Sequence, residues 1–248
     1  SEGRVTVGSW ITLGHPGIAE IFANAGYDWL VIDLEHSTIS IEQAGELIRT
    51  VDLLGVAPLV RLTSNDANQI KRVMDSGAHG IVVPSVSSAN DAALAVASTR
   101  YAPEGTRGVG LGRAQGYGSS FIEYLAWQKT SSVVIVQIEH IDALDNLEEI
   151  FAVPGVDGFI IGPYDLSCSM GMPGEFDRPE FQAAVKRILT AGLHVGCPAG
   201  IHIVEPDTDH LKASVKEGYK FIAYSVDIRM LDVAARAGAK IINEVNMK

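Results

Sequence analysis

Four polar side chains close an apolar run near the start of the chain, in the segment VIDLEHS. Asp33, Glu35, His36 and Ser37 follow residues that are typical of a buried β-strand, so their polar groups lie where the strand leaves the core. His36 can take up or release a proton near neutral pH when a carboxylate orients it. The segment therefore predicts acid–base chemistry at a strand end, with His36 as the proton carrier.

Only its position beside two acids sets His36 apart from the other histidines. A lone histidine more often has a structural role than a catalytic one. We assign that structural role to the six others, which are His15, His79, His140, His194, His202 and His210.

A guanidinium group ends a second apolar run, PLVRL. Arg61 must find an anion in that position, and two anions are available. One is a substrate carboxylate bound through two parallel hydrogen bonds, and the other is an ion pair with Asp33 or Glu35. The sequence leaves both open, and both can hold in different states of the protein.

Two more carboxylates, Glu139 and Asp165, end the neighbouring strand candidates VVIVQIE and DGFIIG. Carboxylates this close repel each other unless one is protonated or a cation lies between them. Mg²⁺ and Mn²⁺ prefer oxygen ligands and are often held by one or two carboxylates plus substrate oxygens. The alternative is that each carboxylate caps a helix. The bend expected at Gly162 and Pro163 favours the metal site.

No lysine is expected at the carboxyl end of a strand, although the chain contains eight. A Schiff-base mechanism requires a desolvated lysine at the site. Carbonyl chemistry here would instead depend on a metal ion as the Lewis acid. The seventh and eighth strand ends also lack a glycine-rich phosphate-binding loop, which disfavours a phosphosugar isomerase.

The strands that carry these groups alternate with amphipathic, helix-like segments. Each strand and helix together occupy close to the roughly 30 residues of a βαβ unit. Near-continuous Val, Ile and Leu runs indicate a parallel sheet buried on both faces. We predict one α/β domain over residues 1–248, a TIM (β/α)8 barrel, with an open doubly wound sheet as the weaker alternative. The strand candidates are residues 5–11, 28–33, 57–62, 80–85, 133–139, 157–162, 194–199 and 221–226.

A barrel of this kind gathers its chemistry at the carboxyl ends of the strands, where the loops converge. By this criterion Trp10, Ser85, Cys197 and Ser225 end the first, fourth, seventh and eighth strands. The longest insertion, residues 102–131 between the fourth and fifth strands, is expected to form a flap over one end of the barrel.

The composition of the chain limits the kinds of partner that the protein is expected to bind. The chain of 248 residues has a net charge of −11 and no Lys/Arg cluster, which argues against nucleic acid and anionic membranes. No stretch of roughly 18 apolar residues and no basic leader segment is present, so we expect a cytoplasmic protein. Cys168 and Cys197 have neither disulfide-framework nor zinc-finger spacing and are expected to be free thiols.

Five segments together resemble the HpcH/HpaI aldolase family, the metal-dependent pyruvate aldolases. They are DWLVIDLEHS, PLVRL, YAPEGTRGVG, VQIE and VDGFIIGPYDLSCSMG, in the family's order and spacing, within a similarity that covers about residues 7–235. The resemblance implies reversible cleavage of a 4-hydroxy-2-oxo acid to pyruvate, or a related 2-oxo acid, and an aldehyde. It also implies a homohexamer in which the C-terminal helix is exchanged between neighbouring subunits.

The resemblance also assigns roles. Glu139 and Asp165 match the ligands of a divalent cation, Mg²⁺ or Mn²⁺ or else Co²⁺, and Arg61 matches the residue that stabilises the enolate charge. His36 matches the proton acceptor. Asp75 matches an acid that raises the basicity of the histidine, although it ends a helix and should point away from its own site, so that contact would cross a subunit interface. Asp33 joins the catalytic group, and the substrate-binding assignments are Trp10, Gln137, Gly162 and Tyr164.

Two other readings stay open. Citrate-lyase-like and phosphoenolpyruvate-mutase-like barrels share a two-carboxylate metal site and are the enzymatic alternatives. A barrel that binds a 2-oxo acid and a metal without turnover is the non-catalytic alternative. The combination of His36 and Arg61 with Glu139 and Asp165 favours catalysis, because a binding protein has no use for a proton carrier.

Overall fold

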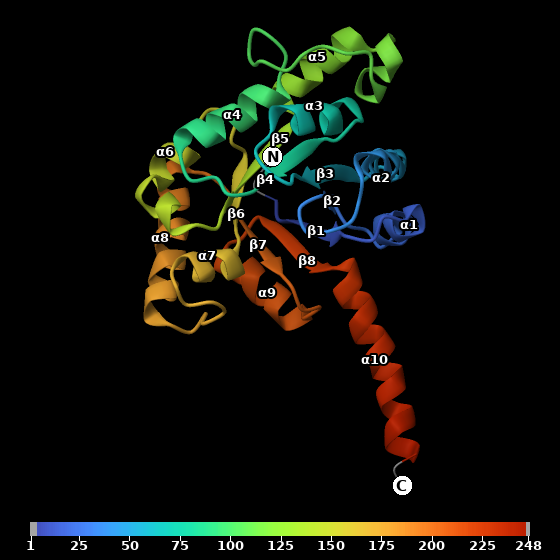
Figure 1. Ribbon diagram of the computed structural model, residues 1–248, viewed down its shortest axis with the longest axis vertical. Helices are drawn as coiled ribbons and strands as arrows, with labels where there is room; N and C mark the ends of the chain where they lie inside the picture. The colour runs from blue at the N-terminus through green and yellow to red at the C-terminus, as the bar shows by residue number, and fades with distance from the viewer. Residues whose placement is uncertain (1–3, 247–248) are drawn as a thin grey trace.

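Eight parallel strands form a closed barrel in the computed structural model, which describes residues 4–246 (Figure 1). Each strand pairs with the next one in the sequence, and β8 closes the barrel by pairing with β1. Closure confirms the predicted (β/α)8 barrel and excludes the open sheet. The strands are β1 (Thr6–Ile11), β2 (Trp29–Asp33), β3 (Ala57–Arg61), β4 (Gly80–Val83), β5 (Val133–Ile138), β6 (Gly158–Ile161), β7 (Ala199–Ile203) and β8 (Phe221–Val226).

Helices cover the outside of the barrel, and their ends carry clear local signals. Ser40 and Gln43 form a reciprocal capping box at the start of α2, and Asp207 caps α9. The helices are α1 (Pro16–Asn24), α2 (Ile41–Leu53), α3 (Ala67–Asp75), α4 (Ala89–Thr99), α5 (Phe121–Thr130), α6 (Leu147–Phe151), α7 (Pro163–Ser169), α8 (Pro179–Val195), α9 (Thr208–Glu217) and α10 (Asp227–Asn246), with 3-10 turns η1 (Arg113–Gly118) and η2 (Ile141–Asp145).

The seventh strand was predicted in the wrong place. Residues 194 and 195 continue α8, which stops at Gly196 in the left-handed conformation (φ 78°), and β7 begins only at Ala199. Glycine tolerates this conformation because it has no Cβ, and a glycine followed by a proline is a common helix end. Cys197 therefore precedes β7 at the amino end of the barrel, and the strand reaches the carboxyl end with different residues.

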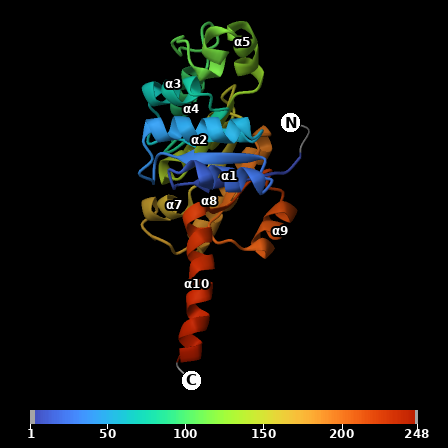
Figure 2. The same cartoon turned by 90° about the vertical axis from the view of Figure 1, so that its right-hand side faces the viewer.

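The insertion of residues 102–131 lies at the amino end of the barrel and does not cover the predicted site. It comprises η1 and α5, which lie beside α3 on the outside of the molecule (Figures 1 and 2). Arg113 and Trp127 share a cavity there with His79, the residue just before β4. The insertion follows α4, whose last turn lies at the amino end, so chain direction fixes this position.

Helix α10 projects away from the barrel as a single long arm (Figures 1 and 2). Its main contacts with the barrel are to β1 and β8, near its first turns, and the helix extends from there away from the body (Figure 1). Asp227, at its first turn, accepts hydrogen bonds from the backbone N–H groups of Thr12 and Leu13 and thereby ties it to the loop after β1. Across residues 4–246, no helix combines the length and apolar character required to traverse a bilayer.

Candidate active site

The alternation of side chains along the strands brings the predicted residues to one level inside the barrel. Val31, Leu59 and Ile135 belong to the apolar cluster that fills the barrel. Two positions further along the same strands stand Asp33, Arg61 and Gln137, which point to the same side because strand side chains repeat every second residue. The polar layer therefore rests on an apolar floor.

Asp33 organises this layer and is almost fully buried, with 1% of its surface exposed. Its Oδ1 accepts hydrogen bonds from the backbone N–H groups of Glu35 (3.0 Å) and His36 (3.3 Å) and from Nε of Arg61 (2.9 Å), while its Oδ2 accepts from Nη2 of Arg61 (2.6 Å). The bidentate pair confirms the ion-pair alternative for Arg61. Asp33 thus fixes both the arginine and the loop that carries His36.

Glu35 is the carboxylate whose protonation is perturbed most clearly. Burial raises the pKa of Glu35 to about 7, Arg61 opposes this effect, and the negative charges of Glu139, Asp33 and Asp165 raise it further. Its Oε2 lies 3.1 Å from Nη1 of Arg61, yet no donor among residues 4–246 is aligned for a hydrogen bond to it. This end of the barrel therefore concentrates negative charge.

A cavity of about 690 Å³ opens over these carboxylates at the ends of β2, β4, β5 and β6. Four candidate residues from three separate segments of the sequence meet there, namely Glu35, His36, Glu139 and Asp165. No lysine from the described part of the chain lines it, as expected from the sequence. The complete lining is Glu35, His36, Ser85, Ser87, Glu139, His140, Asp142, Asp165, Cys168 and Ser169.

Glu139 is buried and held in one orientation. Its Oε1 accepts a hydrogen bond from the backbone N–H of Ser85 (2.6 Å), and its Oε2 accepts from the side-chain amide of Gln137. Ser85 adopts a left-handed backbone (φ 55°), which is unusual for a residue other than glycine and aims its N–H at the carboxylate. A Cβ at position 162 would lie 2.6 Å from Oε2 of Glu139, so Gly162 allows the close approach of β6.

Asp165 lies in the first turn of α7 but does not cap it. The N-cap position is Gly162, and no side chain caps this helix. The turn η2 after Glu139 is instead capped by His140. Neither carboxylate therefore caps a helix through a hydrogen bond, although Asp165 keeps the first-turn position that favours an acid, and the two share a cavity.

The donor set of this cavity fits a hard divalent cation. Glu139 and Asp165 supply carboxylate oxygens, and neither forms an ion pair within the described residues. No group of three or more His, Cys, Asp and Glu side chains in residues 4–246 could enclose a metal ion alone. Mg²⁺ and Mn²⁺ are commonly bound in this way, by one or two carboxylates with water and substrate completing the shell.

Three predicted residues are less closely engaged within the single chain. The His36 side chain is 65% exposed, with Nε2 3.9 Å from Oε2 of Glu35. The Tyr164 ring packs edge-on against Phe176, with ring centroids 4.9 Å apart, and does not line the cavity. Asp75 pairs with buried Arg107 at 2.6 Å, at the end of α3 and thus at the amino end of the barrel.

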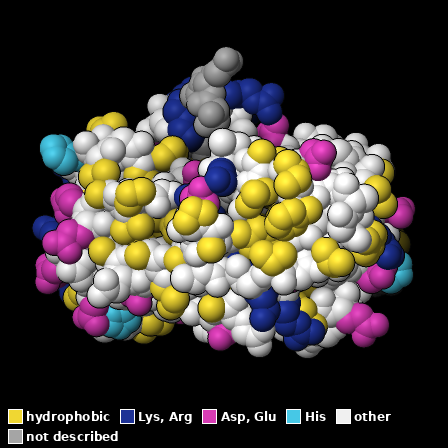
Figure 3. Space-filling view, turned by 90° about the horizontal axis from the view of Figure 1, so that it is seen from above, with side chains coloured by type: hydrophobic (Ala, Val, Ile, Leu, Met, Phe, Trp, Pro, Cys, Tyr) yellow, Lys and Arg dark blue, Asp and Glu magenta, His cyan; other side chains and the backbone are white. Residues whose placement is uncertain are grey.

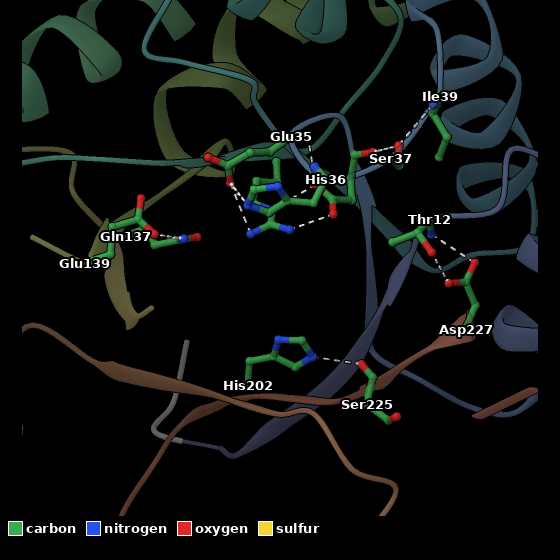
Figure 4. A network of polar contacts seen from close by, with 12 residues as sticks. Thr12, Glu35, His36, Ser37, Ile39, Gln137, Glu139, His202, Ser225 and Asp227 are labelled. Atoms are coloured by element: carbon green, nitrogen blue, oxygen red, sulfur yellow. Dashed lines mark hydrogen bonds and ion pairs between the residues drawn. The ribbon is translucent and has the colours of Figure 1, made fainter. Parts of the chain in front are cut away.

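The sequence assigned no role in the site to two residues at the carboxyl end of the barrel. His202, assigned a structural role by default, lies in β7 with its Nε2 3.2 Å from the backbone oxygen of Ser225 (Figure 4). Correct placement of β7 would have identified it, since the alternation in AGIHI turns Gly200 and His202 to the same side. Asp227, noted only as lying beyond the eighth strand, joins the loop after β1 to α10 through Thr12 (Figure 4).

Fold and site together define a class, the (β/α)8-barrel enzymes that act through a divalent cation. The HpcH/HpaI aldolase/citrate lyase family model matches residues 6–233, and the chain belongs to this family. The chain is 39% identical to a hydroxypyruvate/pyruvate aldolase of Sagittula stellata over 95% of this chain and 92% of that one. It is 38% identical to a 4-hydroxy-2-oxo-heptane-1,7-dioate aldolase of Salmonella typhimurium, over 95% and 89%.

Solved structures agree with this assignment. A family protein from Burkholderia cenocepacia superposes with a TM-score of 0.90 at 33% identity, covering 97% of this chain and 95% of that one. An HpcH/HpaI aldolase from Desulfitobacterium hafniense gives 0.89 at 29% identity, covering 98% and 94%. The barrel, including its closure, is therefore shared with these relatives.

Proposed function

We propose that this protein is a divalent-metal-dependent aldolase that reversibly cleaves a 4-hydroxy-2-oxo acid to pyruvate, or a related 2-oxo acid, and an aldehyde. The aldolase names of relatives at 37–39% identity support the reaction class. The observation that carries the proposal is the single cavity in which Glu139 and Asp165 meet Glu35 and His36, with Arg61 against Glu35.

Glu139 and Asp165 would hold the cation, which we propose to be Mg²⁺ or Mn²⁺, with Co²⁺ as a further candidate. Bound there, the cation would supply Lewis-acid polarisation of the keto group of the substrate. Ser85 and Gln137 hold Glu139 by its two oxygens, so the ligand is oriented before a cation arrives. Gln137, the backbone around Gly162 to Tyr164, and Trp10 are proposed to contact the substrate.

His36 is proposed to remove the proton from the C4 hydroxyl, directly or through a water molecule. Its exposed side chain at the edge of the cavity is free to meet an incoming substrate. As the C3–C4 bond breaks, C4 leaves as the aldehyde carbon and the electron pair enters the 2-oxo acid, which becomes an enolate. Protonation at C3 then yields the second product.

Arg61 is proposed to stabilise the enolate oxygen. Asp33 holds its Nε and Nη2, while Nη1 faces Glu35, which lines the cavity. A preorganised donor of this kind contributes on the order of 3 kcal/mol to transition-state stabilisation. Because Asp33 fixes the guanidinium in advance, little reorganisation accompanies the reaction.

The protein is proposed to act as a homohexamer with α10 exchanged between subunits. On α10 the exposed apolar residues include Leu231, Ile241, Ile242 and Val245, which the chain itself leaves uncovered. Hydrophobic side chains also gather on the side of the molecule that carries α5 (Figure 3), where the insertion exposes large apolar residues, namely Val109, Leu111, Tyr117 and Ile122. Apolar patches of this kind are typical of subunit interfaces.

Assembly would also bring Asp75 to the histidine of a neighbouring subunit, where it would raise the basicity of that group.

A cytoplasmic location is part of the same proposal, and the free thiols of Cys168 and Cys197 support it. Native mass spectrometry of the full chain tests the assembly, and loss of the hexamer on removal of residues 231–248 is the expected result.

Pyruvate release from racemic 4-hydroxy-2-oxo acids, coupled to lactate dehydrogenase, tests the reaction. Activity is expected with Mg²⁺ or Mn²⁺ and should disappear with chelator and return with metal. Borohydride added with pyruvate should leave the protein unlabelled, because no lysine among residues 4–246 lines the cavity. Covalent trapping would contradict the metal route, and failure to release pyruvate from a broad panel would favour a protein that only binds 2-oxo acids.

A further inference from the structure

The wall of the barrel opposite the carboxylates carries a histidine that the proposed reaction does not use. His202 lies on β7, with its ring centroid 5.3 Å from that of Trp10. The same indole lies under Arg61, whose guanidinium carbon is 4.5 Å from the ring centroid. Figure 4 shows the His202 ring pointing from its strand toward the opening around which Glu35 and Glu139 are drawn. His202 thus shares a wall with the proposed enolate-stabilising residue.

The backbone around His202 is built to hold the ring. Ser225 is fully buried and has a left-handed backbone (φ 55°), a strain of about 1–3 kcal/mol for a residue other than glycine. In this conformation its carbonyl oxygen accepts a hydrogen bond from Nε2 of His202 (3.2 Å), and the hydroxyl of Ser9, which donates to the backbone oxygen of Tyr224 (2.8 Å), lies 3.2 Å from the same oxygen. The hydroxyl of Ser225 donates to the backbone oxygen of Val204 (2.8 Å). Three strands thus fix one imidazole.

This anchoring decides which ring nitrogen carries the proton. A carbonyl oxygen only accepts, so Nε2 of His202 must be the N–H group, and Nδ1 of the neutral ring is an acceptor. Nδ1 makes no hydrogen bond to any of the described residues. The atom is not completely buried, so a small group of a ligand can reach it. His202 therefore presents a free acceptor.

The ring also stays neutral over the physiological range. Burial lowers the pKa of His202 to about 4, and the positive charge of Arg61 lowers it further. The carbonyl of Ser225 and the negative charge of Asp33 act in the opposite direction. A neutral acceptor at this place cannot attract the carboxylate of the substrate, so it must serve a group that donates a hydrogen bond.

Trp10, on the same wall, carries a polar group without a partner among the described residues. The indole N–H of Trp10 is buried and has no acceptor among residues 4–246. A hydroxyl group can donate its hydrogen to Nδ1 of His202, so a hydroxylated substrate complements this wall. A methyl group would leave Nδ1 without a donor, and unpaired polar groups in a site discriminate strongly between substrates that differ by one hydroxyl.

We propose that His202 is a specificity-determining residue that accepts a hydrogen bond from a hydroxyl group of the substrate. The inference rests on the proposed aldolase function and adds a substrate class to it, namely hydroxylated partners. The hydroxyl can come from C3 of the 2-oxo acid or from the carbon next to the aldehyde group. A hydroxyl at either position would donate the same hydrogen bond to Nδ1, and a kinetic comparison of substrates distinguishes the two.

The test compares two ratios of kcat/KM in the wild type, His202→Leu and His202→Asn. The first ratio is 3-hydroxypyruvate over pyruvate with propanal as the acceptor, and the second is glyceraldehyde over propanal with pyruvate as the donor. His202→Leu is expected to lower one of the two ratios at least about 10-fold. His202→Asn is expected to restore part of it, because the amide oxygen can stand in for Nδ1. The ratio that responds identifies the source of the hydroxyl.

Two results would overturn the inference. Both ratios could remain unchanged in His202→Leu, or all four rates could fall equally in both variants, which would indicate a structural role. Equilibrium binding separates this failure from failure of the aldolase proposal, because it needs no turnover. Tryptophan fluorescence with Mn²⁺ gives the Kd of 3-hydroxypyruvate and of pyruvate. If no substrate pair reacts, a Kd ratio that is the same in wild type and His202→Leu rejects the role of His202.

Discussion

Both ends of the barrel carry acidic, histidine and arginine side chains, but the two ends differ in how far these charges are paired. At the amino end, a cavity of about 570 Å³ contains Asp52, His79 and Arg113, and at the carboxyl end a cavity of about 690 Å³ contains an acid and a histidine with an arginine behind them. At the amino end, Asp52 contacts Nε2 of His79 at 3.0 Å and Nη2 of Arg113 at 2.5 Å. One carboxylate there serves two nitrogen donors, so the cluster satisfies itself.

At the carboxyl end, by contrast, acidic side chains outnumber the cationic groups that pair with them. Arg61 is engaged by Asp33 and approached by Glu35, while Glu139 and Asp165 have no ion pair in the described part of the chain. Negative charge that the protein does not neutralise is costly unless a cation or a proton is supplied from outside. An excess of unpaired charge, rather than the mere presence of ionisable residues, therefore distinguishes the functional end from the structural end.

The largest expected effect comes from removing one of those unpaired charges. Glu139→Gln should lower kcat/KM at least about 1000-fold, because loss of an outer partner of a metal ligand alone costs about 10–100-fold. Metal titration followed by calorimetry should show weakened Mn²⁺ binding. Glu123→Gln, in the cavity at the amino end, is the matched control and should leave both values unchanged. Equal losses in the two variants would erase the distinction between the ends.

Arginine replacement gives the next largest effect. Arg61→Lys should lower kcat about 100-fold, since lysine keeps the charge but loses the fork that Asp33 orients. Mn²⁺ affinity should change little, because Arg61 is not a ligand. Arg113→Lys replaces the guanidinium that makes a single hydrogen bond to Asp52 and should alter only stability, measured by thermal unfolding. A normal rate in Arg61→Lys would refute the enolate role.

The carboxyl end should also show a specific pH dependence of stability. His202 has a folded-state pKa of about 4, below the ordinary value of 6.5, so below pH 6.5 protons bind the unfolded chain preferentially. Its contribution is complete above pH 6.5 and is lost as the pH falls toward 4. In the wild type the free energy of unfolding, measured with urea, should fall between pH 7 and pH 5. This fall should be about 2 kcal/mol smaller in His202→Leu. An identical difference would show that His202 is not held neutral.

The smallest effect is expected from the self-satisfied cluster. Asp52→Asn removes the negative charge and one of the two acceptor oxygens that His79 and Arg113 use, and it should cost about 1 kcal/mol, or about 2–4 °C in the melting temperature. The half-exposed position limits the loss. Pyruvate release should remain at the wild-type rate, and a clear fall in kcat would show that the two ends are coupled.

Most of the carboxyl end could be predicted because its residues directly follow apolar strands. In a parallel barrel the last residues of every strand lie on the same face. Asp33, Arg61 and Glu139 could therefore be placed together before any distance between them was known. Residues 194–199 failed this rule, because a helix end and a strand start are both apolar and only Gly196 marks the boundary. His202 was missed for the same reason.

Contacts between segments could not be predicted in this way. Chain direction places Asp75 at the amino end, as expected, but its partner Arg107 comes from the insertion and carries no local signal. The same holds for the hydrogen bond from Ser85 to Glu139 and for the one between His202 and Ser225, which depend on left-handed backbones at two serines. Such conformations are rare outside glycine and follow from packing rather than residue type.

The sequence by itself determined the barrel, the face that carries the chemistry and the oxygen-rich character of the site, because hydrophobic periodicity and strand order are local properties that chain direction extends to the whole fold. Only the tertiary structure decided which charges are neutralised. Asp33 pairs with Arg61, whereas Glu139 and Asp165 have no cationic partner among residues 4–246. Neutralisation depends on distances of a few ångströms between segments far apart in the sequence, and those distances exist only after the barrel has closed.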